Sequence, residues 1–179
     1  MKLLVIVDMQ NDFVTGTLGF PEAKEIIQPI QSKIEEYLSN NDQILFTMDT
    51  HFDVTYNKSR EGKHLPIYHC INGTKGHELV DSLKTFANYT NVVYKIDTFG
   101  ICNARITDRF TTCQNNIQEI EFVGLVTNLC VLSCAICFQS HFTSSEITID
   151  ASCCRSFDKD LHEKALDIME GLQMRVINR

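Results

Sequence analysis

The sequence lacks several features that would place it in other classes of protein. It has no excess of positive charge, because 16 lysines and arginines face 23 aspartates and glutamates, which disfavours a nucleic-acid partner. It has no apolar run near the roughly 18 residues of a membrane span, and Asp8 comes too early for a signal peptide. It has no internal repeat and no linker rich in proline or glycine. We therefore expect one cytoplasmic domain, residues 1–179, that binds neither nucleic acid nor membrane.

Cysteine, in contrast, is abundant, with eight residues. In a cytoplasmic protein most should be reduced thiols that pack as small apolar side chains. Cys130, Cys134 and Cys137 form a C-x3-C-x2-C pattern, a spacing that could ligate an iron–sulfur cluster. They would, however, share one face of a helix, whereas a cluster needs a loop that wraps around it. We expect no iron–sulfur cluster and core-facing positions for Cys134 and Cys137, with a CxxC redox pair as the alternative.

Short apolar runs alternate with amphipathic stretches along the chain. This alternation predicts right-handed crossovers and a parallel sheet with helices on both faces. We predict an α/β fold: a single doubly wound domain with a six-stranded, mainly parallel sheet in the order 3-2-1-4-5-6. The expected strands are residues 2–8, 43–49, 91–95, 119–125, 146–150 and 174–177, and the expected helices are 22–38, 76–86, 104–113, 128–142 and 159–171.

Three reactive side chains fall at or just beyond the carboxyl ends of predicted strands, where such folds bind ligands. Asp8 could accept a proton, Lys95 could stabilise negative charge, and Cys130 lies near the start of a helix, where a thiolate would have a lowered pKa. Together they make an activated nucleophile with a carboxylate base. Each residue alone has a plainer explanation: a turn aspartate, a solvated lysine, a buried cysteine.

Three segments carry a family resemblance. VIVDMQNDF (5–13), YKIDTFG (94–100) and GLVTNLCV (124–131) resemble the signatures of the isochorismatase-like cysteine hydrolases, a superfamily that includes the nicotinamidases. The resemblance implies Asp8 as base, Lys95 as its charge partner and Cys130 as nucleophile. It also implies a cis peptide between Val126 and Thr127, and an oxyanion hole made by the backbone N–H groups of Val126 and Cys130.

A polar loop follows the second predicted strand and has the residues of a metal site. Asp49 and His51 point the same way in extended chain, and Glu61 and His69 come later in the loop. Such a set suits Zn²⁺, Mn²⁺ or Fe²⁺, although a solvated, hydrogen-bonded loop would need the same residue types.

The stretch DTH…EGKHLPIYHCINGTKG resembles the metal-binding region of nicotinamidases, in which the ion orients the pyridine nitrogen of nicotinamide. The resemblance implies Asp49, His51 and His69 as ligands of one divalent ion, with Glu61 as a possible fourth, and no organic cofactor. Many relatives have a tryptophan here and this chain has none. A flat substrate would therefore have to stack on Phe13, Phe99 or Tyr68.

The sequence thus predicts a metal-assisted cysteine amidohydrolase that converts nicotinamide and water to nicotinate and ammonia through a thioester on Cys130, with a place in NAD salvage. Small enzymes of this family tend to assemble, so we expect a homo-oligomer. Within the superfamily, the substrate could instead be another small amide or a vinyl ether. Outside enzymes, a small-ligand or metal-binding module and a thiol redox protein stay open.

Overall fold

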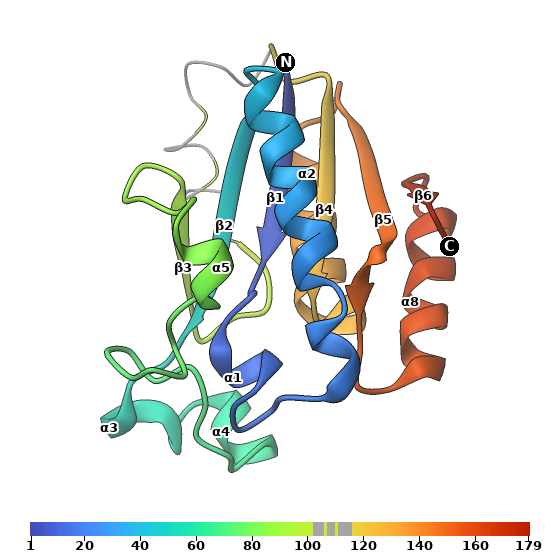
Figure 1. Ribbon diagram of the computed structural model, residues 1–179. Coiled ribbons are helices and arrows are strands. Elements are labelled where there is room, and N and C mark those ends of the chain that lie inside the picture. Colours follow the sequence, from blue (N-terminus) through green and yellow to red (C-terminus); the bar gives the residue numbers. More distant parts are fainter. Residues whose placement is uncertain (102–105, 107–109, 111–115) are drawn as a thin grey trace.

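A parallel β-sheet forms the centre of the molecule (Figure 1). The computed structural model describes residues 1–101, 106, 110 and 116–179. Within these residues, six strands form one sheet in the order β3-β2-β1-β4-β5-β6, and each neighbouring pair is parallel. The predicted fold class and strand order are therefore confirmed. The strands are β1 (Lys2–Val7), β2 (Gln43–Thr50), β3 (Val92–Ile96), β4 (Glu119–Leu125), β5 (Glu146–Arg155) and β6 (Arg175–Ile177).

Helices cover both faces of this sheet. One face packs on α2 (Ile27–Ser39) and α5 (Asp81–Lys84), and the other on α7 (Leu132–His141) and α8 (Lys159–Gly171). Side chains of a strand alternate between its faces, so Val5 of β1 lies in the core under α7 while Ile6 lies in the core under α2. Cys134 is buried in the first of these cores and Cys137 packs partly buried against it, which confirms their predicted core-facing positions.

Two predicted helices differ from those observed. The helix expected at 22–38 divides into a 3-10 turn, η1 (Pro21–Lys24), and α2; Pro29 has no backbone N–H and is tolerated only in the first turn of the helix that contains it. The helix expected at 76–86 shortens to α5, because the residues before it bond to the N-terminal segment, as in Val80 N–H to Met9 O (3.0 Å). The helix expected at 104–113 falls largely outside the described residues.

The carboxyl ends of β1 to β4 meet at one edge of the sheet, the lower edge in Figure 1. Three short helices surround that edge: α1 (Asn11–Val14), α3 (Asp53–Tyr56) and α4 (Arg60–His64). A π-helical turn (Thr127–Val131) follows β4 and leads into α7. In the part of the chain that the structure describes, no helix has the length and apolar character needed to cross a membrane.

Candidate active site

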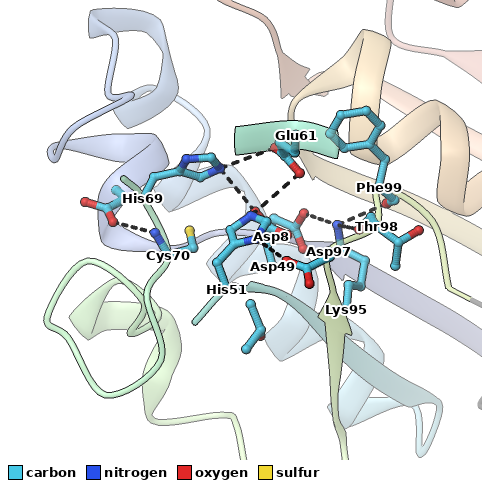
Figure 2. A network of polar contacts seen from close by, with 12 residues as sticks. Asp8, Asp49, His51, Glu61, His69, Cys70, Lys95, Asp97, Thr98 and Phe99 are labelled. Carbon is cyan, nitrogen blue, oxygen red and sulfur yellow. Dashed lines mark hydrogen bonds and ion pairs between the residues drawn. The ribbon is translucent and has the colours of Figure 1, made fainter. Parts of the chain in front are cut away.

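Asp8, Lys95 and Cys130 meet at the edge of the sheet where the parallel strands have their carboxyl ends (Figure 2 shows the first two). The Lys95 ammonium lies 2.6 Å from a carboxylate oxygen of Asp8 and 3.2 Å from the sulfur of Cys130. All three side chains are buried, and Cys130 borders a cavity. The structure therefore brings the predicted acid, amine and thiol to one point, with the amine in contact with both of the others.

The local backbone and its neighbours fix the Asp8 carboxylate. Asp8 follows β1 with a φ of 49°, a left-handed conformation that aspartate tolerates better than most residues. Its N–H bonds to the Thr47 carbonyl at 3.2 Å, and the Thr47 hydroxyl donates to its carboxylate at 2.6 Å. Lys95 lies opposite Asp49 in the β2–β3 register and also donates to the Phe99 carbonyl at 3.0 Å. The parallel sheet thus places β1, β2 and β3 next to one another, and with them Asp8, Thr47 and Lys95.

Burial controls the protonation of this group. It raises the pKa of Asp8, while Lys95 opposes the rise. Burial likewise raises the pKa of the Cys130 thiol well above its ordinary value, again against the effect of Lys95. The lowered Cys130 pKa expected from its place near a helix start is therefore wrong, because loss of solvent outweighs the effect of the neighbouring Lys95 cation. A thiol of this kind needs a base, and a buried carboxylate with a raised pKa is a suitable one.

Cys130 lies in the π-helical turn that follows β4. The cis peptide bond joins Leu125 to Val126, so the predicted position between Val126 and Thr127 is wrong by one bond. The physical reason is that β4 stays paired with β5 through Leu125, so the chain leaves the sheet there, before the turn begins. The Val126 carbonyl accepts bonds from the N–H groups of Leu129 and Val131. Val126 and Cys130 both border the cavity.

Four side chains next to these residues form a candidate metal centre: Asp49, His51, Glu61 and His69. The Nε2 atoms of the two histidines lie 3.1 and 3.5 Å from one Asp49 oxygen, and 3.7 and 3.5 Å from the Glu61 oxygens. Two ligand atoms about 2.1 Å from one ion, at a tetrahedral angle, are about 3.4 Å apart. The spacing of this group therefore fits a single divalent cation.

The surroundings of the four ligands support the same conclusion. Nδ1 of His51 bonds to the Asp97 carboxylate at 2.8 Å and Nδ1 of His69 to the Ile67 carbonyl at 2.9 Å, which leaves each Nε2 facing the centre, as in metal-bound histidines. The Oδ1 atom of Asp49 is buried without a hydrogen-bond partner among the described residues. Burial alone would lower the pKa of His69, but hydrogen bonds to Asp49 and Glu61 raise it to about 10. A field this negative favours a cation.

One cavity of about 320 Å³ connects the two groups, a volume at the small end of ligand pockets. Of the three aromatic residues expected to contact a flat substrate, Phe13 and Phe99 border the cavity, whereas Tyr68 does not: its ring packs on Tyr56, with ring centroids 5.0 Å apart. The remaining wall is mainly apolar. The bordering residues are Phe13, Leu18, Gly19, Phe20, Asp49, Glu61, Leu65, His69, Phe99, Val126, Leu129, Cys130 and Phe157.

The sequence analysis missed several residues of this site. Asp97 could have been found, because it is a carboxylate in the same YKIDTFG segment that contains Lys95. Thr47 gives no such indication, since a threonine inside a strand is common. Phe20 and Phe157, whose rings lie edge to face at 6.2 Å on the cavity wall, come from distant loops and have no local pattern.

Comparisons with known proteins show which family this chain matches and which proteins it resembles. Residues 2–179 match the family model of the isochorismatase domain. The nicotinamidase of Saccharomyces cerevisiae is 24% identical, over 100% of both chains. A crystal structure of nicotinamidase/pyrazinamidase PncA from Bacillus subtilis is 27% identical with a TM-score of 0.83, and covers 98% of this chain and 99% of that one. Pyrazinamidase of Pyrococcus horikoshii, solved in complex with zinc, shares the fold at 22% identity and a TM-score of 0.79, over 99% of both chains.

Proposed function

The chain belongs to the isochorismatase family, and on that premise we propose that it is a metal-assisted cysteine amidohydrolase that converts nicotinamide and water to nicotinate and ammonia. One observation supports this most directly. The Lys95 ammonium contacts both Asp8 and the Cys130 sulfur, next to a cavity whose wall also contains metal-binding side chains. The family relationship to two nicotinamidases supports the choice of substrate.

In the first half of the reaction, the Asp8 carboxylate takes the proton of the Cys130 thiol. The thiolate attacks the amide carbonyl carbon, and the carbonyl oxygen becomes an oxyanion that accepts hydrogen bonds from the backbone N–H groups of Val126 and Cys130. The carboxylic acid of Asp8 then gives its proton to the amide nitrogen. The carbon–nitrogen bond breaks, ammonia leaves, and the acyl group stays on Cys130 as a thioester.

In the second half, Asp8 is the base again. It takes a proton from a water molecule as the water oxygen attacks the thioester carbon, and the carbon–sulfur bond breaks to release the acid. The proton returns to the Cys130 sulfur. Lys95, in contact with both groups, stabilises whichever of them carries the negative charge.

The candidate metal centre completes the substrate site. Asp49, His51, Glu61 and His69 would hold one divalent ion, and this donor set suits Zn²⁺ first and Mn²⁺ or Fe²⁺ next. When bound, the ion would supply a Lewis-acidic anchor for a ring nitrogen. Phe13 and Phe99, on the cavity wall, would contact the faces of the substrate ring.

We extend the proposal to the setting of the enzyme. Buried thiols among the described residues, such as Cys70, Cys153 and Cys154, support a cytoplasmic location. The product nicotinate supports a place in NAD salvage. A homo-oligomer stays a prediction from the family resemblance.

The first prediction concerns activity. The purified protein should release ammonia from nicotinamide, a chelator should abolish the release, and added Zn²⁺ should restore it. Cys130→Ala should lower kcat by at least about 10³-fold, because the nucleophile is lost. Cys137→Ala, which removes a half-buried thiol of α7, is the matched control and should keep full activity.

Other substrates separate the alternatives. Pyrazinamide, a simple aliphatic amide and isochorismate should be assayed beside nicotinamide, by release of ammonia or, for the vinyl ether, of pyruvate. Faster turnover of one of these would move the assignment within the family. Full activity of Cys130→Ala on nicotinamide would contradict the thioester mechanism.

A further inference from the structure

The six-residue segment from Asp8 to Phe13 contains more than the proposed base. Asp8 is in the catalytic group and Phe13 is on the cavity wall. Two of the polar side chains between them, Gln10 and Asp12, are buried and bond to the backbone of Asp49 and Cys70, beside the candidate metal ligands. The proposed mechanism uses neither of them.

Gln10 binds the peptide groups on both sides of the Asp49 α-carbon. Its side-chain oxygen accepts the Asp49 N–H at 2.8 Å, and its side-chain nitrogen donates to the Asp49 carbonyl at 2.9 Å. The second hydrogen on that nitrogen goes to the His77 carbonyl at 2.8 Å. Every donor of the amide is therefore used, and Asp49 is held from both sides at the end of β2.

Asp12 does the same for the later part of the loop. One carboxylate oxygen accepts the Cys70 N–H at 2.7 Å, and the other accepts the N–H and hydroxyl of Thr17 at 3.3 and 3.1 Å. Cys70 follows His69 directly, has a φ of 46°, and its carbonyl accepts the His51 N–H at 3.0 Å. The Asp12 carboxylate thus holds the backbone of Cys70, which follows His69 in the chain and accepts a hydrogen bond from the backbone of His51.

The Asp12 carboxylate packs closely against the backbone of Gly76. A Cβ atom at Gly76 would lie 2.1 Å from the Asp12 oxygen that holds Cys70, and the Gly76 carbonyl accepts the Asp12 N–H at 3.0 Å. Only glycine fits at this close approach. The hydrogen bonds of Gln10 and Asp12 therefore hold the residues around Asp49 and His69 at a defined position relative to the segment Asp8–Phe13.

We propose that Gln10 and Asp12 are positioning residues, which hold the ligands Asp49, His51 and His69 at a fixed place relative to the Asp8–Lys95–Cys130 group. This inference rests on the proposed metal site of the enzyme. Residues that orient metal ligands typically contribute 10- to 100-fold to metal affinity, so the effect should appear in metal binding itself and not only in turnover.

The test measures Zn²⁺ affinity of the metal-free protein by competition with a chromophoric chelator. Gln10→Met keeps the length of the side chain and removes its three bonds; Asp12→Asn leaves only one acceptor for two sets of donors. Each should raise the Kd for Zn²⁺ by about 10- to 100-fold. Gly76→Ala, which displaces the Asp12 carboxylate without changing any ligand, should do the same.

Two controls make the result specific. Tyr37→Phe removes a buried hydrogen bond to Glu121, away from the site, and should leave the Zn²⁺ Kd within about twofold of wild type while it lowers the unfolding midpoint. Alkylation of Cys130 by iodoacetamide, located by mass spectrometry in the metal-free protein, should proceed at the wild-type rate in all variants.

Three results would overturn the inference: unchanged Zn²⁺ affinity in Gln10→Met and Asp12→Asn, an equal loss of affinity in Tyr37→Phe, or a wild-type chain that binds no Zn²⁺. The result is independent of the substrate. A protein that binds Zn²⁺ as expected but does not hydrolyse nicotinamide would refute the proposed function and leave the positioning role standing.

Discussion

At the scale of single residues, the site depends on the buried Lys95 ammonium and the buried Asp8 carboxylate, whose opposite charges compensate each other. Lys95 is almost fully buried, and burial lowers its pKa, but Asp8 and Cys130 raise it well above the ordinary value. It therefore stays protonated throughout the proposed reaction. The buried site disfavours both the Asp8 carboxylate and the Cys130 thiolate, because neither anion is solvated there. The Lys95 cation contacts both groups and stabilises each anion, so a proton can pass between them.

The second prediction concerns the pH dependence of this transfer. Asp8 must be deprotonated to accept the thiol proton, so kcat/KM should fall as the pH drops through its raised pKa. Thr47→Val removes the hydroxyl that donates to the carboxylate and should raise that pKa further. A hydrogen bond to a charged group contributes about 1.5–3 kcal/mol, so the acidic limb should move upward by about one pH unit or more.

The matched control for this measurement is Thr148→Val, a buried threonine of β5 that bonds to Glu119. Its pH profile should coincide with that of the wild type. If the acidic limb of Thr47→Val stayed in place or moved to lower pH, Asp8 would not be the group that sets it.

At the scale of elements, one charged cluster connects α2 to the sheet. Lys33 of α2 lies 2.6 Å from Glu121 of β4 and 2.8 Å from Asp150 of β5, and the Tyr37 hydroxyl also bonds to Glu121. Burial raises the pKa of Asp150, but bonds from Lys33 and Ser152 lower it below its ordinary value. The stability from this pair is therefore present above the ordinary carboxyl pKa and is lost as the pH falls through the lowered one.

The third prediction tests this connection. Lys33→Met should lower the free energy of unfolding by about 3 kcal/mol at pH 7, because two buried carboxylates lose their cation. Denaturant unfolding measures it, and the loss should shrink once the pH falls below the ordinary aspartate pKa of about 3.9, as Asp150 takes up a proton. Lys84→Met breaks an exposed ion pair with Glu78 and should cost less than about 1 kcal/mol. Equal losses in the two variants would refute the role of the cluster.

At the scale of the whole molecule, the site exists because neighbouring parallel strands end together. The central contact is between β1 and β4, the strands that lead to Asp8 and to the turn with Cys130. Gly124 of β4 is paired with Val7 and has a φ of 118°, and a Cβ there would lie 2.2 Å from the Val7 carbonyl oxygen. Any side chain would push the two strands apart just before the reactive residues.

The fourth prediction follows from this close approach. Gly124→Ala should lower the free energy of unfolding by at least about 3 kcal/mol, since it adds a steric clash to backbone strain worth about 1–3 kcal/mol, and should abolish ammonia release. Gly171→Ala, at the end of α8 with open space around it, should be neutral or stabilising by about 0.5–1 kcal/mol. A Gly124→Ala protein with wild-type stability would show that the strands can separate without cost.

The sequence by itself determined the order of the strands and the candidates for the reactive side chains. Apolar runs such as Glu119–Leu125 and the amphipathic stretch Lys159–Gly171 have the same bounds in the structure, because the spacing of apolar residues is a local property of the chain. Asp8, Lys95 and Cys130 could be found for a similar reason: a reactive residue at a strand end needs only a correctly located strand.

Only the tertiary structure decided what surrounds those residues. The pKa of Cys130 is raised and not lowered because the thiol is buried. Packing likewise decides that the cis bond joins Leu125 to Val126 and that Tyr68 lies outside the cavity. The same holds for Gln10. In the sequence it looks like any other glutamine, and only the folded structure places its amide against the backbone of Asp49. Solvent exclusion and hydrogen bonds between distant segments are set by the fold as a whole, so no local pattern contains them.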